Sequence, residues 1–327
     1  MRLRSSVQES SATVPPAVLR IAHYSDTHSL HRSIEPTFKL PPADILIHTG
    51  DFTDGGSDEA IADFNEWLGE LRSRSLYKYI VVIGGNHEYS TTSIKCEGVA
   101  YHSPEEEVDP CFLKSRLTNA THVLHHEAVT IEGLTIFGSP WVPWHKNGQP
   151  GRLDRPAYPT ATHAQALYEA EAARTGIRKP RVHRFDDIPS GVDVLLTHGP
   201  PPGIFDNISP GGPRSWGSSP ELAEAILRAQ PTAHLFGHLH EQRGQWVRHS
   251  EGSFRGGVEY RPNAASAYTF PTAGPPPPGY PCQYISNNAM KNHPGIDGHL
   301  DSIAGPPRLI TATRGPNGWA FDGAPAC

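Results

Sequence analysis

Residues 44–55 read DILIHTGDFTDG, an apolar run that ends in a cluster of glycine and carboxylate residues. The apolar part, residues 45–47, would be buried on both faces, which is typical of a central strand covered on both sides of its sheet. Glycine then allows a turn with positive φ, and aspartate caps turn backbone. By itself this pattern is also typical of an ordinary turn, so its meaning depends on the rest of the chain.

The same pattern recurs along the chain. The predicted strands are Leu19–Tyr24, Asp44–His48, Tyr79–Ile83, Val129–Phe137, Val192–Thr197, Ala233–Phe236 and Arg308–Thr313. Helical spacing of apolar residues predicts a helix over Ser57–Arg72 and another that begins at Ser219 and runs through Ile226. The alanine-rich residues 162–174 are predicted to be helical as well. Strands of this kind between helices indicate an α/β fold.

With 327 residues, the chain is long enough for one α/β domain with a substantial core. We expect residues 1–18 to form a disordered arm and residues 19–327 to form the domain. Segments 90–118, 141–190 and 250–282 interrupt the pattern and are predicted to be irregular insertions. The last of them contains PTAGPPPPGYPC, which is too rich in proline and glycine for regular structure.

The charge balance limits the classes of partner. The chain has 28 Lys and Arg against 34 Asp and Glu, a net charge of −6. Duplex nucleic acid or an anionic membrane would require a basic excess, so neither is an expected partner. The N-terminus has no apolar signal-peptide core, and no run approaches the ~20 apolar residues of a membrane helix. The predicted location is therefore cytoplasmic.

The chain has four cysteines, which is too few for a disulfide scaffold in this length, and none forms a CxxC pair. A zinc ribbon is therefore not predicted. Cys96 and Cys111 lie in one irregular segment, and the sequence leaves open whether they pair. The 19 histidines are more informative, because histidine in excess serves either as a solvated loop residue or as a metal ligand, and position decides.

Metal-ligand residue types follow five of the predicted strands. The clusters are Ser25-Asp26-Thr27-His28, Gly50-Asp51-Phe52-Thr53-Asp54, Gly85-Asn86-His87-Glu88, His198-Gly199-Pro200-Pro201 and Gly237-His238-Leu239-His240. Each cluster alone is also typical of a turn or an incidental histidine. In open α/β sheets, however, functional groups gather where strands end. Five such clusters in succession predict one shared site.

The order DxH, GDxxD, GNHE, a single His before Gly, and GHxH resembles the calcineurin-like metallophosphoesterases. The resemblance extends from about Leu19 to His240. SDTHS, FNEWLGEL, VTIEGLTIFGSPW and LTHGPP are similar to its small cytosolic metallophosphoesterase-domain-containing branch, relatives of brain-expressed animal phosphodiesterases. The resemblance implies a four-layer α/β/β/α sandwich with two mixed sheets. Some animal relatives lack the first histidine of the last block, but this chain keeps His238.

The resemblance also implies a binuclear metal centre. It assigns Asp26, His28 and His240 to the first ion, Asn86, His198 and His238 to the second, and Asp51 to a bridge between them. Carboxylate, amide and imidazole ligands suit Mn²⁺, Fe, Zn²⁺ or Mg²⁺ better than soft copper, and Mn²⁺ is our expectation. Two ions ~3.5–4 Å apart would share and activate a water molecule for attack on phosphorus.

His87 has a separate implied role. The resemblance makes it the acid that protonates the leaving oxygen, with Asp54 orienting its ring. A structural histidine at 87 and a simple turn cap at 54 are the alternatives. Glu88 is predicted to be structural.

The other histidines are predicted to serve structure. We expect His23 and His48 to be hydrogen-bonded in the core, and His122, His125 and His126 to lie at the surface. The run from Trp141 through Trp144 and His145 to Asn147 is interpreted either as part of a substrate pocket wall or as a packed aromatic loop.

The predicted function is hydrolysis of a phosphate ester, and a phosphodiesterase acting on cyclic nucleotides or small diesters is favoured. Protein Ser/Thr phosphatase relatives carry arginine directly after the second Asp of GDxxD, where this chain has Gly55. The alternatives are a phosphomonoesterase or protein phosphatase, a metal-bound non-catalytic regulatory module, and a specialised-metabolite enzyme on the same scaffold.

Overall fold

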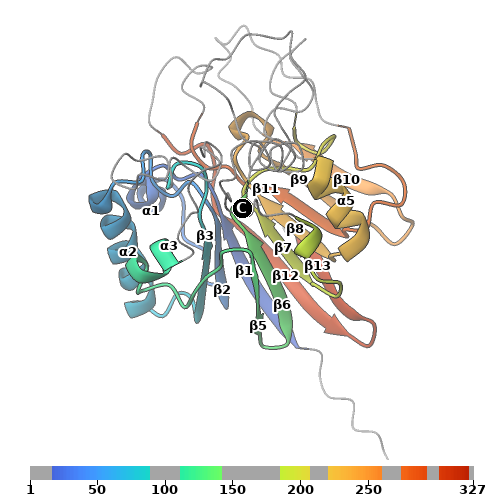
Figure 1. Ribbon diagram of the computed structural model, residues 1–327, viewed down its shortest axis with the longest axis horizontal. Coiled ribbons are helices and arrows are strands. Elements are labelled where there is room, and N and C mark those ends of the chain that lie inside the picture. Colours follow the sequence, from blue (N-terminus) through green and yellow to red (C-terminus); the bar gives the residue numbers. More distant parts are fainter. Residues whose placement is uncertain are drawn as a thin grey trace, which may run out of the picture.

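The computed structural model describes residues 17–88, 111–141, 185–206, 220–259, 274–292 and 302–323. These residues form two β-sheets that face each other, with helices on both outer sides (Figure 1). In Figure 1, α1, α2 and α3 lie to the left of the sheets and α5 lies to the right. The predicted helix at 162–174 lies outside the described residues.

The first sheet has a parallel centre and an antiparallel edge. Strands β1 to β4 run parallel, and β12 and β13 continue the sheet antiparallel beyond β1. In sheet order the strands are β13 Gly318–Gly323, β12 Arg308–Gly315, β1 Val18–Tyr24, β2 Ile45–Thr49, β3 Tyr79–Ile83 and β4 His122–Val123.

The second sheet is mixed in the same way. Strands β11, β8, β7 and β6 are parallel, whereas β9 and β10 at one edge and β5 at the other pair antiparallel. In sheet order the strands are β10 Phe254–Val258, β9 Gly244–Arg248, β11 Tyr284–Asn287, β8 Ala233–Phe236, β7 Val194–Thr197, β6 Leu134–Ser139 and β5 Glu127–Ile131.

The helices cover the outer faces. They are α1 Ile34–Thr37, α2 Asp58–Ser73, α3 Cys111–Arg116 and α5 Pro220–Ala229, with short 3₁₀ turns η1 His31–Ser33, η2 Phe185–Asp187 and η3 His240–Gln242. The Ser57 side chain caps α2 by accepting a hydrogen bond from the N–H of Ala60. Phe64 and Leu68 of α2 then pack on the outer face of the first sheet.

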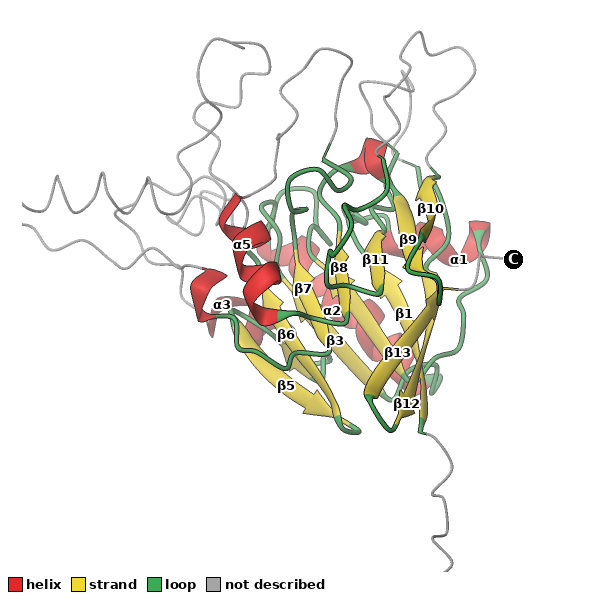
Figure 2. Ribbon diagram, turned by 90° about the vertical axis from the view of Figure 1, so that its right-hand side faces the viewer, coloured by secondary structure: helices red, strands yellow, loops and turns green. Residues whose placement is uncertain are grey.

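Three apolar layers hold the sandwich together. Ile47 and Val81 of the first sheet meet Leu196 and Leu235 of the second in a core between the sheets. Ile226 of α5 packs in a separate cluster on the outer face of the second sheet. Because one layer separates the sheets and one lies under each set of helices, the predicted four-layer α/β/β/α sandwich with two mixed sheets is confirmed (Figure 2).

The predicted single strand Val129–Phe137 is wrong, because it is a hairpin of β5 and β6. Glu132 and Gly133 form its turn with φ of 49° and 79°. Two positive φ angles in succession give the turn the twist that a two-residue hairpin requires. Each of the two apolar runs is short, so the sequence pattern alone does not reveal the turn between them.

The segments predicted to be irregular contain some regular structure. Helix α3 lies within 90–118, the 3₁₀ turn η2 lies within 141–190, and β10 lies within 250–282, where it pairs with β9. Strands β4, β9, β11 and β13 were not predicted from the sequence either. Val18 already belongs to β1, so the N-terminal arm ends before residue 18.

Candidate metal centre

The polar clusters meet at one rim of the sandwich, where parallel strands of both sheets end. Within the first sheet, the N–H of Asp26 after β1 donates to the carbonyl of Gly50 after β2 (2.9 Å). Between the sheets, the N–H of His238 after β8 donates to both carboxylate oxygens of Asp26 (3.0 and 2.9 Å). These bonds bring loops far apart in the sequence to a single place.

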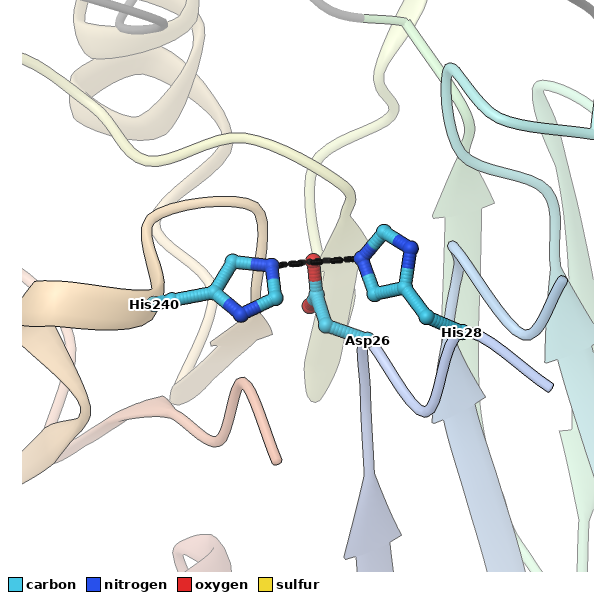
Figure 3. Close-up of side chains that lie close together, drawn as sticks. All are labelled: Asp26, His28 and His240. Carbon is cyan, nitrogen blue, oxygen red and sulfur yellow. Dashed lines mark hydrogen bonds and ion pairs between the residues drawn. The ribbon is translucent and has the colours of Figure 1, made fainter. Parts of the chain in front are cut away.

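The first group of candidate ligands is Asp26, His28 and His240. The Nε2 atoms of the two histidines are 3.2 Å apart. Oδ1 of Asp26 is 3.5 Å from Nε2 of His240 and 3.9 Å from Nε2 of His28. Figure 3 shows the Asp26 carboxylate between the two imidazole rings, so three potential ligand atoms converge on one position.

The second group is Asp51, His198 and His238. Nε2 of His198 lies 3.2 Å from Oδ2 of Asp51 and 3.1 Å from Oδ1 of Asn86. The ring centroid of His238 is 5.0 Å from that of His198. The amide oxygen of Asn86 therefore reaches the same position as the carboxylate and the imidazoles.

Asp51 lies between the two groups. Its Oδ2 atom is 3.8 Å from Nε2 of His28 in the first group, in addition to its contact with His198 in the second. The structure thus brings together all seven residues that the sequence predicts as ligands.

Hydrogen bonds on the far side of each ring aim the imidazoles. Nδ1 of His198 donates to the carbonyl of Thr49 (2.8 Å), and Nδ1 of His240 donates to the carbonyl of Lys291 (2.6 Å). A carbonyl only accepts, so Nδ1 carries the proton and Nε2 faces the rim as a lone pair in the neutral ring.

The donor set fits metal ions. In the neutral rings, Nε2 of His28 and Nε2 of His240 would point lone pairs at each other across 3.2 Å, which a cation between them relieves. Asp26 and Asp51 are buried, and burial raises the pKa of Asp26, because an unpaired carboxylate is costly away from water. Carboxylate, amide and imidazole together form a borderline-hard set that suits Mn²⁺, Fe, Zn²⁺ or Mg²⁺.

Electrostatics also favour a cation in the second group. Burial lowers the pKa of His198, but the carboxylates of Asp51 and Asp26 outweigh burial and raise the pKa to about 10. The metal-free ring therefore attracts a proton to the place where a cation would bind.

Strained backbone supports this arrangement. Asp26, His28, Asp51 and His238 all have positive φ, at 50°, 43°, 52° and 69°. Non-glycine residues avoid this region, and strained residues cluster at functional sites. Gly237 is required for a related reason: a Cβ there would overlap the carboxylate of Asp26 and the hydroxyl of Ser25.

His87 lies at the edge of both groups. Its Nε2 atom is 3.9 Å from Oδ2 of Asp51, and its ring centroid is 4.5 Å from that of His28. Burial lowers the pKa of His87, but Asp51 and the carbonyl of Asp54 outweigh it, so the pKa is raised above 6.5. The ring therefore tends to hold a proton near the site.

Asp54 contacts His87 differently from the predicted arrangement. Nδ1 of His87 donates to the main-chain carbonyl of Asp54 (2.7 Å), not to its carboxylate. Oδ1 of the carboxylate instead lies 3.2 Å from Nδ1 of His28 and 3.1 Å from Nζ of Lys291. Asp54 therefore orients two histidines, one through its backbone and one through its side chain.

Glu88 is a buried structural carboxylate. It accepts hydrogen bonds from the N–H groups of Asp51, Thr53 and Gly85 (2.9, 2.9 and 2.7 Å). Burial and the nearby Asp51 raise the pKa of Glu88 to about 7. It ties the loop after β2 to the loop after β3, which carries Asn86.

For the other histidines, some of the predictions hold and one is wrong. His23 and His48 are buried and hydrogen-bonded, to Ser286 and Thr49 and to Thr27 respectively, as predicted. The surface prediction for His125 is wrong: it is 7% exposed, and its ring packs edge-on against Trp141 at 5.9 Å between centroids. Packing of Trp141 favours the aromatic-loop interpretation, while Trp144, His145, Asn147 and Cys96 lie outside the described residues.

Sequence reasoning missed the segment after β11. Asn287 and Asn288 donate from their side chains to the carbonyls of Leu239 and His23, and Lys291 contacts both Asp26 and His240 through its backbone. The only signal in the sequence is the pair Tyr284-Ile285 followed by polar residues, which is too short to predict a strand. The proline-rich residues before it concealed the strand.

Family comparison agrees with this fold and site. A model of the calcineurin-like phosphoesterase family matches residues 19–242. The chain belongs to this family, whose members are metal-dependent and hydrolyse phosphate esters.

Individual relatives point the same way. Metallophosphoesterase domain-containing protein 1 of Homo sapiens is 36% identical over 244 residues, which covers 71% of this chain and 64% of the human protein. A UPF0046 protein of Caenorhabditis elegans is 32% identical over 250 residues, covering 71% of this chain and 54% of that protein. The matches thus span less than two thirds of these relatives' own lengths.

One solved structure is similar at a lower level. A phosphopantetheinyl hydrolase from Mycobacterium tuberculosis has a TM-score of 0.40 and 18% identity, over 72% of this chain and 86% of its own.

In the described part of the chain, no helix has both the length and the apolar character needed to cross a membrane.

Proposed function

We propose that the chain is a two-metal phosphodiesterase that hydrolyses small or nucleotide-type diesters. Asp26, His28 and His240 would hold one ion, Asn86, His198 and His238 would hold the other, and Asp51 would contact both. When bound, two such ions supply Lewis acidity and an activated water. Mn²⁺ is the proposed metal.

The observation that carries the proposal is the position of Asp51. Its Oδ2 atom lies 3.2 Å from Nε2 of His198 and 3.8 Å from Nε2 of His28, so one carboxylate oxygen serves both groups. A site for a single ion has no need of two separate sets of imidazoles around one carboxylate.

The chain's own residues supply orientation and a proton. Hydrogen bonds from Nδ1 hold the rings of His198 and His240, so the ligand atoms are in place before an ion binds. His87 is the proposed general acid. Its Nδ1–H is fixed by the carbonyl of Asp54, which leaves Nε2 to face the site and deliver a proton to the leaving oxygen.

The lack of a phosphate-binding side chain at Gly55 favours a diester over a monoester as the substrate. Gly55 has no side chain, so this position, where protein Ser/Thr phosphatase relatives carry arginine, contributes no group to bind a dianionic phosphate. A diester carries a single negative charge and needs less positive charge from the protein. The general acid serves a diester well, because an alkoxide is a poor leaving group without protonation.

The test is metal-dependent turnover of two aryl substrates by the full chain. With Mn²⁺ added to metal-free protein, kcat/KM on bis(p-nitrophenyl) phosphate should exceed that on p-nitrophenyl phosphate. The Asp51→Asn variant, purified identically, controls for contaminating phosphatases.

The opposite preference would select the phosphomonoesterase alternative. Two bound ions without turnover of either substrate, or of a wider panel of phosphate esters, would instead support a non-catalytic regulatory module.

A further inference from the structure

Lys291 lies beside the first group of ligands and is connected to it in two places, at His240 and at His28. It lies after β11, in a segment that pairs with the loop after β1, where its N–H donates to the carbonyl of Asp26 (2.9 Å). Its side chain is 8% exposed. A lysine this buried beside a cationic site requires a reason, because desolvating an ammonium is costly.

The backbone of Lys291 orients the ring of His240. Its carbonyl accepts the hydrogen bond from Nδ1 of His240 at 2.6 Å, which fixes the ring's tautomer and direction. This contact is made by backbone, so any residue at position 291 provides it.

The side chain of Lys291 holds His28 through a carboxylate. Nζ of Lys291 lies 3.1 Å from Oδ1 of Asp54, and the same oxygen lies 3.2 Å from Nδ1 of His28. The side chain of Asp54 is 64% exposed, so its rotamer is free to change unless a partner fixes it. The ammonium, held on a buried stem, is such a partner.

We propose that Lys291 is a positioning residue for the first metal position: it fixes the Asp54 carboxylate, which in turn orients His28 toward the ion. The inference rests on the proposed two-metal function and assigns a role that the ligand motifs do not contain. Contacts of this kind behind a metal-binding histidine are worth about 10–100-fold in metal affinity.

The direction in which metal affinity changes when Lys291 is replaced distinguishes a positioning role from a simple charge effect. An ammonium near a cation repels it, so charge alone predicts that removing Lys291 tightens metal binding. Positioning predicts the opposite, because a released Asp54 no longer holds the ring of His28.

The experiment is calorimetric titration of metal-free full-length protein with Mn²⁺. Lys291→Met keeps the apolar stem and removes the charge, and it should weaken one of two binding steps by roughly tenfold while the other step stays unchanged. Lys78→Met is the matched control, because Lys78 pairs with Glu132 in an exposed ion pair outside the site, and both steps should be unaffected.

A double mutant tests the route through Asp54. In an Asp54→Ala background, which removes the oxygen that both Lys291 and His28 contact, Lys291→Met should add little further weakening, since both changes remove the same contact. Additive losses would overturn the route, and tighter or unchanged binding in Lys291→Met would overturn the inference.

Two further outcomes are decisive. If neither Lys291→Met nor Lys291→Gln folds, judged by circular dichroism, Lys291 is a structural group and the inference is overturned. If the wild-type chain itself binds fewer than two ions, the proposed metal centre fails together with this inference. Two wild-type steps that stay unaltered in Lys291→Met overturn this inference alone.

Discussion

Nε2 of His28 and Nε2 of His240 face each other across 3.2 Å, although the two residues are 212 positions apart in the sequence. His240 donates from Nδ1 to a carbonyl, and His28 has a carboxylate 3.2 Å from its Nδ1. With the proton on Nδ1 of each ring, both rings present bare Nε2 atoms to the same point. Such a pair is unfavourable alone and favourable around a cation, and this relationship connects the fold to the metal chemistry.

Replacing Asp51 should abolish turnover. Asp51→Asn removes a negative charge that faces both groups, so both ions should bind more weakly and hydrolysis of bis(p-nitrophenyl) phosphate should fall to background. His122→Ala, in the short edge strand β4, should keep near wild-type turnover. Near wild-type kcat for Asp51→Asn at saturating Mn²⁺ would show that the ligand assignment is wrong.

Gly237 should tolerate no side chain. A Cβ there would overlap the Asp26 carboxylate, so Gly237→Ala should displace that carboxylate and reduce metal content, measured by elemental analysis after dialysis. Gly55→Ala is the control, because a Cβ at Gly55 meets nothing within 4 Å. Equal metal content in the two variants would contradict the position of Asp26 in the first group.

His87 should affect chemistry more than metal binding. His87→Ala should lower kcat by roughly 10²–10⁴, the usual contribution of general acid–base catalysis, when the leaving group is a ribose hydroxyl. The loss should be much smaller for bis(p-nitrophenyl) phosphate, because p-nitrophenolate leaves without protonation.

Metal content measured in the same His87→Ala preparation decides between two roles. Nε2 of His87 lies near Asp51 and His28, in a third group that also has metal-ligand geometry. Retained ions with a leaving-group-dependent loss agree with a general acid. Loss of an ion would make His87 a ligand instead.

His31 should contribute to the pH dependence of stability. Burial against Phe64 and Trp67 lowers the pKa of His31 to about 4, although Asp63, 3.0 Å away, partly opposes this. Between pH 6.5 and 4 the unfolded chain binds this proton and the folded chain does not, so stability is lost as the pH falls.

The His31→Phe variant isolates this contribution. In urea unfolding between pH 6.5 and 4, its free energy of unfolding should fall less steeply than that of wild type, by about 1.4 kcal/mol per pH unit for one proton. An identical slope in both proteins would show that His31 is already protonated in the folded state.

Motifs at strand ends made much of the site predictable. Asp26, Asp51 and Asn86 each follow a strand in the predicted order, and parallel pairing brings those strand ends to one rim. Local sequence could not show which atom of Asp54 contacts His87, because that depends on the path of the loop. Lys291 was missed for a similar reason, since its role arises from pairing between segments more than 230 residues apart.

The central strands β2 and β3 were more predictable than the edge strand β10. The central strands β2 and β3 are apolar on both faces and lie where the sequence predicts. Strand β10 contains glycine and arginine and is half exposed, so its pattern resembles a loop, and only pairing with β9 makes it a strand. The tertiary contact, not local preference, determines its structure.

The most direct measurement is the number of Mn²⁺ ions bound per chain by metal-replete, active protein, determined by elemental analysis after removal of free metal. The seven ligands arranged around Asp51 predict two ions per chain. One ion or none in a preparation that hydrolyses bis(p-nitrophenyl) phosphate would contradict the two-metal centre.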